Sequence, residues 1–282
     1  MRHSKPAPFL RSVVKRVGDI PGLAGMCAGF EDGRWRFDQF AEHLIEWLPD
    51  FALNDREFEN IQGANARRAL RLAAEAVYTS DKYERRGEVG EILLHAVIRQ
   101  EFDSETIISK VFFKDAPNDT VKGFDAVHVV EAPDGLELWL GEVKLYRDLV
   151  SAVRDVVVEL NTHTRTPYLR TEFAAIMRKL DPQHRHYGVL AALLDINTSI
   201  DQVFERICIP VLLTYDCPVV AKRSRSDQAY EAALTAEFER HFQRFAGAEL
   251  PREIKIVLIL VPMNTKAKLL ECFNRKLKGL LA

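Results

Sequence analysis

The stretch that decides the fold is Lys122-Gly-Phe-Asp-Ala-Val-His-Val-Val-Glu-Ala-Pro-Asp-Gly-Leu-Glu-Leu-Trp-Leu-Gly-Glu-Val-Lys144. β-Branched and aromatic residues fill both of its halves, as is typical of strands. Between the halves, Pro133-Asp134-Gly135 is a turn sequence. We therefore expect two antiparallel strands, over residues 121–130 and 136–145, that are joined by a tight turn.

Three ionisable residues on these strands form a candidate catalytic group. Alternate residues of a strand share a face, so Glu142 and Lys144 point the same way and Val143 points the other way. Asp125 lies 17 positions before Glu142 (142 − 125), which suits neighbouring antiparallel strands. Two adjacent carboxylates repel each other, and Mg²⁺ or Mn²⁺ is the natural ion to hold them together. Such an ion activates water, and Lys144 can orient that water or neutralise transition-state charge. The pattern therefore predicts a metal-dependent phosphodiesterase.

The rest of the chain predicts an α/β layered core. Residues 85–98 read as an amphipathic helix, with Glu91 at the border of its apolar face and Glu88 further round. The other expected helices cover 37–48, 65–77, a segment that starts at 146, and 227–245. The other expected strands cover 106–113, 187–194, 207–215 and 254–261.

Composition limits the classes of function. The 282 residues carry 39 Lys+Arg against 41 Asp+Glu, so any contact with DNA must come from a local patch or a partner. The four cysteines are scattered, which predicts reduced thiols and neither a zinc site nor a disulfide framework. There is no apolar run of membrane-spanning length and no signal-peptide pattern, so we expect a cytoplasmic protein without a membrane partner.

The helix, the two strands with Asp125 and Glu142-Val-Lys144, and the following helix resemble the PD-(D/E)xK nuclease superfamily. The resemblance implies a metal held by Asp125, Glu142 and the backbone carbonyl of Val143, with Lys144 at the reacting water. Glu91 would complete the site, and Glu88 is the alternative. The superfamily proline before the aspartate is replaced here, a common departure.

More narrowly, Gly-Phe-Asp-Ala-Val-His (123–128), Gly-Glu-Val-Lys-Leu-Tyr (141–146) and the chain length resemble the HamA family, the nuclease subunits of the Hachiman anti-phage defence system. This resemblance implies a Mg²⁺-dependent deoxyribonuclease that acts on DNA with a helicase subunit resembling HamB. It implies a PD-(D/E)xK nuclease-like domain over 81–282, with a mixed central sheet flanked by helices. Residues 1–80 would be a mostly helical N-terminal extension and a possible partner-docking region.

Two other functions remain open from the sequence: a catalytically inactive adaptor that binds DNA or a helicase, and a stand-alone restriction-type or repair nuclease. We interpret His128 as a structural histidine, because strand alternation points it away from Asp125. The histidines of His184-Arg185-His186 read as parts of a polar loop. Basic residues could contact phosphate if they border the Asp125–Glu142 site; they are Lys222, Arg223, Arg225, Lys266, Lys268, Arg275, Lys276 and Lys278.

Overall fold

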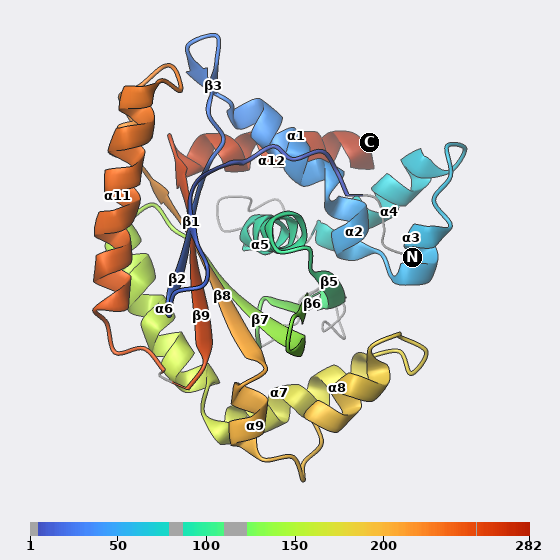
Figure 1. Ribbon diagram of the computed structural model, residues 1–282. Coiled ribbons are helices and arrows are strands. Elements are labelled where there is room, and N and C mark those ends of the chain that lie inside the picture. The colour runs from blue at the N-terminus through green and yellow to red at the C-terminus, as the bar shows by residue number, and fades with distance from the viewer. Residues whose placement is uncertain (1–4, 79–86, 110–122, 252) are drawn as a thin grey trace.

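The computed structural model describes residues 5–78, 87–109, 123–251 and 253–282. Its centre is a seven-stranded mixed sheet with the order β1-β2-β9-β8-β7-β6-β5 (Figure 1). Strands β2, β9, β8 and β7 run parallel to one another, while β1, β6 and β5 are antiparallel to their neighbours. The strands of this sheet are β1 Arg11–Arg16, β2 Gly22–Cys27, β5 Glu105–Ser109, β6 Ala126–Ala132, β7 Gly135–Leu145, β8 Ile207–Asp216 and β9 Lys255–Met263.

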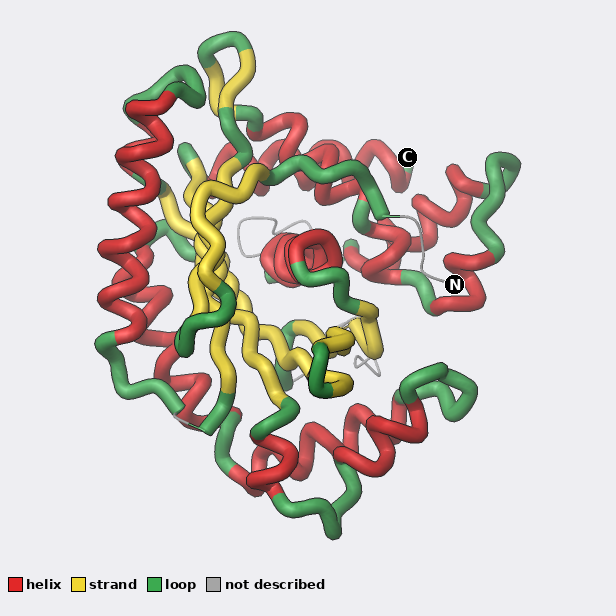
Figure 2. Tube along the Cα trace, in the orientation of Figure 1, coloured by secondary structure: helices red, strands yellow, loops and turns green. Residues whose placement is uncertain are grey.

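Helices cover both faces of the sheet, and Figure 2 shows them in red around the yellow strands. One face carries α1 Phe37–Glu46, α2 Leu48–Ala52, α3 Asp55–Glu59, α4 Ala66–Val77, α5 Glu88–Glu101 and α12 Lys266–Leu281. The other carries α6 Leu149–His163, α10 Pro218–Ala221 and α11 Gln228–Ala246. Beyond one end of the sheet lie α7 Thr166–Lys179, α8 Tyr187–Leu193 and α9 Ile200–Phe204, and a small hairpin pairs β3 Phe30–Glu31 with β4 Arg34–Trp35. In the described residues, every helix is too short or too polar to cross a bilayer.

The predicted fold class is confirmed: the protein is an α/β protein with a mixed central sheet flanked by helices. The two strands of the deciding stretch are β6 and β7, paired from Ala126↔Gly141 to Ala132↔Gly135 around the predicted turn. The predicted helices and the strands at 207–215 and 254–261 also form, within a few residues of the expected bounds. The strand expected over 106–113 appears as β5 up to Ser109, and residues 110–113 lie outside the described part.

One predicted strand is wrong. Residues 187–193 form helix α8, in which Leu190 is buried while Val189 is 54% exposed. Periodicity alone does not separate a short apolar run in a buried strand from one in a helix. Here the alanines and leucines of the run favour the helix.

Residues 1–80 hold more than helices. Residues 11–27, within the predicted N-terminal extension, contribute β1 and β2 to the central sheet, where β2 pairs in parallel with β9. The single helix expected over 37–48 is divided at Trp47, after which α2 starts with Pro49 in its first turn. The proposed domain boundary at residue 80 stays a prediction.

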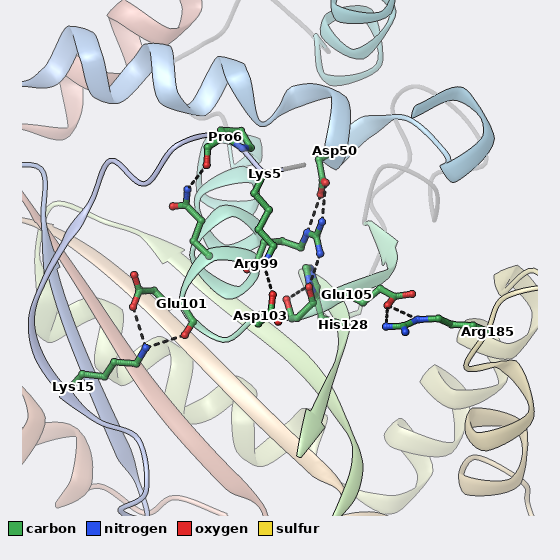
Figure 3. A network of polar contacts seen from close by, with 12 residues as sticks. Lys5, Pro6, Lys15, Asp50, Arg99, Glu101, Asp103, Glu105, His128 and Arg185 are labelled. Carbon is green, nitrogen blue, oxygen red and sulfur yellow. Dashed lines mark hydrogen bonds and ion pairs between the residues drawn. The ribbon is translucent and has the colours of Figure 1, made fainter. Parts of the chain in front are cut away.

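A buried polar network joins the N-terminal helices to α5 (Figure 3). Asp50 of α2 accepts hydrogen bonds from Arg99 Nε at 3.2 Å and Nη2 at 3.0 Å, and it lies 2.7 Å from His95 Nε2. Arg99 Nη1 also donates to the carbonyl of Ser104, whose hydroxyl lies 2.9 Å from His128 Nδ1. His128 is 1% exposed and faces this network, which confirms its interpretation as a structural histidine.

Candidate active site

Asp125 and Glu142 lie side by side at the start of β6 and near the end of β7. The amide of Asp125 donates to the carbonyl of Gly141 at 2.8 Å, and the ladder begins with Ala126 opposite Gly141, so Asp125, one residue before β6, lies next to Glu142. Both are buried, with 9% and 2% of their surface exposed. Asp125 Oδ2 accepts a hydrogen bond from the amide of Val143 at 2.9 Å. The fold therefore brings the two predicted carboxylates together.

Glu142 sits in an environment that opposes its charge. Burial is the main reason that its pKa rises to about 7. The hydrogen bond with His163 acts against this rise, and the negative charge of Asp125 adds to it. His163 Nδ1 lies 2.5 Å from Glu142 Oε1. Burial lowers the pKa of His163, but the bond to Glu142 and its charge outweigh burial, so that pKa is raised.

Lys144 lies on the same face of β7 as Glu142, as the alternation predicts. Its ammonium bonds to Glu159 of α6, and its side chain is 13% exposed. Burial lowers the pKa of Lys144. The hydrogen bond to Glu159 and the negative charges of Glu159, Glu142 and Asp125 together outweigh burial, so the pKa of Lys144 is raised. Lys144 is therefore a fixed positive charge beside the carboxylate pair.

Glu91 and Glu88 lie on α5, which packs against the opposite face of β7. A Cβ added to Gly90 would stand 3.1 Å from Val143 Cγ2, which marks the line of contact between the helix and the strand. At about 100° per residue, Glu91 is about 100° from that line and Glu88 about 160°. Glu91 is also 8% exposed, while Glu88 is half-buried. α5 thus meets the face of β7 away from Glu142, and the role of Glu91 as a ligand, with Glu88 as the alternative, stays a prediction.

Sequence reasoning missed His163 of α6, which bonds to Glu142, and the side chains that lie around it. The ring of His163 stacks on Tyr168, with centroids 4.4 Å apart and planes at 12°, and meets Phe124 edge-on at 5.5 Å. A Cβ on Gly123, where φ is +155°, would stand 2.7 Å from Glu172 Oε2. His163 follows Val156 and Leu160 on the buried stripe of α6, and this periodicity was the one signal that could have revealed it.

The carboxylate pair fits a divalent ion. Oxygen donors suit Mg²⁺ or Mn²⁺, and Mg²⁺ is commonly held by one or two carboxylates with water in its other positions. Burial is the main cause of the raised pKa of Glu142, and the negative charge of Asp125 adds to it; a bound cation would oppose both effects. Among the residues that the structure describes, no group of three His, Cys, Asp or Glu side chains is gathered tightly enough to hold an ion by itself. The pair therefore supplies a partial ligand set, and the Val143 carbonyl stays a predicted ligand.

The remaining sequence predictions have structural explanations. His184 Nε2 lies 3.2 Å and His186 Nε2 lies 3.5 Å from the carboxylate of Glu105 on β5, which also bonds to Arg185. Residues 184–186 thus form a polar loop that contacts β5, as the sequence predicted.

Together, the fold and these residues define an α/β protein with a candidate active site of paired carboxylates and a lysine on β6 and β7. The sequence pattern of the HamA family matches residues 9–277, and the chain belongs to that family. "Anti-bacteriophage protein A" of Escherichia coli (strain K12) is 27% identical over 245 residues, which are 86% of this chain and 43% of that protein. The chain thus spans less than half the length of this curated relative.

Proposed function

We propose that this protein is a metal-dependent DNA nuclease that acts in anti-phage defence. The observation that carries the proposal is the adjacency of Asp125 and Glu142, both buried, with Lys144 on the same face of β7. Membership of the HamA family and similarity to a protein named for its action against bacteriophage support the defence role. We further propose that it works in the cytoplasm with a helicase subunit, because its net charge of −2 provides no overall attraction to DNA.

Each residue has a defined part in this mechanism. Asp125 and Glu142 would hold Mg²⁺ or Mn²⁺, with the Val143 carbonyl and Glu91 completing the site. When bound, the ion supplies an activated water and neutralises charge on the phosphate. Lys144 has three N–H donors, so it can keep its bond to Glu159 and still donate to the attacking water or to a phosphate oxygen.

Neighbouring residues hold the carboxylates of Asp125 and Glu142 in fixed orientations before an ion binds. His163 fixes the orientation of the Glu142 carboxylate through its Nδ1. The Val143 amide fixes one oxygen of Asp125. Groups held in this way lose little freedom when they bind an ion or a substrate, and this preorganisation favours catalysis.

The test is cleavage of DNA by the purified chain with Mg²⁺, Mn²⁺ or EDTA, with and without the helicase partner. We expect metal-dependent cutting that Glu142→Gln and Lys144→Met each reduce at least about 100-fold, in the range seen for loss of one electrostatic catalytic group. Glu137→Gln is the matched control, because Glu137 lies on the same strand but pairs with Lys255. If wild type and both variants leave DNA equally intact under every condition, the inactive adaptor is the better function.

A further inference from the structure

Two cations lie just beyond the candidate site, where β7 and β8 end. Lys266 is the first residue of α12, and its Nζ donates to the carbonyl of Leu145 at 2.5 Å, one residue past Lys144. Its backbone amide donates to Asp216 Oδ1 at 2.6 Å, at the end of β8. Arg147 is held at the same edge, because its carbonyl accepts a bond from the Asp216 amide at 3.0 Å. Both residues therefore have fixed backbones next to the catalytic strand.

The positive charges of Arg147 and Lys266 are not neutralised by an ion pair with a carboxylate in the part of the chain that the structure describes. Within the described ranges, no carboxylate oxygen lies within 4.0 Å of a charged nitrogen of either Arg147 or Lys266. Burial is the main cause that lowers the pKa of Lys266, and the positive charge of Arg147 is the next, although Asp216 acts in the opposite direction. Arg147 is an exposed residue. Two like charges held close to each other are relieved by an anion that binds between them.

Other basic residues are poorer candidates for the same task. Arg275 and Lys276 of α12 pair with Asp38, at 3.1 Å and 3.2 Å. Arg225 pairs with Asp227 at 2.8 Å. These cations already have carboxylate partners, whereas the first residue of α12 borders the candidate site.

We propose that Arg147 and Lys266 form a phosphate-binding pair that holds the nucleic-acid backbone against the carboxyl ends of β7 and β8. This inference rests on the proposed function and adds its substrate contact. Ligands of open α/β sheets bind outside the carboxyl ends of the strands, which is where the pair lies. Arginine binds phosphate through a planar fork and lysine as a point charge, and such contacts position the backbone without reading sequence.

The position of the pair relative to Lys144 gives it a mechanistic role. Lys144 and Arg147 are three residues apart on the chain. Lys266 bonds to Leu145, which directly follows Lys144. A phosphate held by Arg147 and Lys266 would therefore place the neighbouring phosphodiester near Asp125 and Glu142. The pair would orient the substrate, and the chemistry would stay with the carboxylates and Lys144.

Binding can be tested separately from cleavage. Fluorescence anisotropy of a labelled DNA duplex, measured in EDTA with the full chain from 50 to 200 mM salt, gives Kd and its salt dependence. Each lost phosphate contact should make the slope of log Kd against log salt shallower by about 0.9. We expect this change for Arg147→Ala and for Lys266→Met, and about twice as much for the double variant. Arg71→Ala is the control, since Arg71 is an exposed cation on α4 that pairs with Glu75, and we expect this variant to bind as wild type does.

The outcomes separate this inference from the proposed function. Wild-type affinity and salt slope in both Arg147→Ala and Lys266→Met would overturn the pair, even if wild type cuts DNA. Absence of duplex binding by the wild-type chain would overturn it as well. Conversely, Arg147-dependent binding without metal-dependent cleavage would support the pair and refute the nuclease. Because Lys266 also bonds to Leu145, its replacement could unfold the protein, so thermal unfolding is measured for each variant. If Lys266→Met is unfolded, the result for Arg147→Ala alone decides the test.

Discussion

Replacement of Asp50 by alanine should destabilise the protein more than any single surface change, because it breaks the buried network of Figure 3. Asp50 and Arg99 have side chains that are only 6% and 7% exposed, and two hydrogen bonds of 3.0 Å and 3.2 Å join them. Removing Asp50 leaves the guanidinium buried without its carboxylate. Loss of one partner of a buried ion pair costs about 3–5 kcal/mol. A domain is typically stable by roughly 5–15 kcal/mol, so the loss would be a large fraction of the total.

The assay is urea unfolding at pH 7, followed by tryptophan fluorescence, for wild type, Asp50→Ala and a control. The control is Glu75→Ala, which removes the exposed pair of Glu75 with Arg71 on α4. An exposed pair with this i,i+4 spacing is worth only about 0.3–0.5 kcal/mol. If Asp50→Ala costs no more than Glu75→Ala, the network does not anchor the N-terminal helices, and the reasoning fails.

The same network predicts a dependence on pH. Burial would raise the pKa of Asp50, but the bonds and charges of His95 and Arg99 outweigh burial and hold that pKa well below its usual range. Its contribution to stability is therefore present above the unfolded-state pKa of about 3.9 and is lost as pH falls below it. In wild type, the urea midpoint should drop between pH 5 and pH 3 by more than in Asp50→Ala.

Three further predictions concern the core and the site. Gly25→Val should lower the free energy of unfolding by about 1–3 kcal/mol, because its Cβ would lie 2.4 Å from the Phe238 ring. Gly18→Val is the control, since a Cβ at Gly18 meets no atom within 4 Å. Equal losses of stability in the two variants, measured by urea unfolding, would refute the close packing at Gly25. Metal-free protein should lose stability as pH rises from about 4.3 to about 7, since native Glu142, with a pKa raised to about 7, binds a proton that the unfolded chain has released. Urea midpoints at pH 5 and pH 8 measure this loss, and a Glu142→Gln variant with the same pH dependence would contradict the assignment. His163→Ala should weaken Mg²⁺ binding at pH 7 by roughly 10–100-fold, as the loss of a residue that orients a metal ligand does. Calorimetric titration with Mg²⁺ measures the affinity. An unchanged affinity would show that His163 does not position Glu142.

The local patterns of the sequence determined the strand that carries Glu142 and Lys144, and its orientation. Alternation with a period of two residues places Glu142 and Lys144 on one face, and the Pro133-Asp134-Gly135 turn fixes the pairing that sets Asp125 next to Glu142. These features depend on neighbours within about 20 residues, so the sequence displays them directly. The two signature segments, together with the chain length, indicated the HamA family, which the match over residues 9–277 confirms.

Only the tertiary structure decided what surrounds that strand. The joining of β2 to β9, the contact of Lys266 with Leu145 across 121 positions, and the bond of His163 to Glu142 depend on how distant segments pack. Hydrophobic periodicity says which face of an element is buried, but it carries no information about which element covers that face.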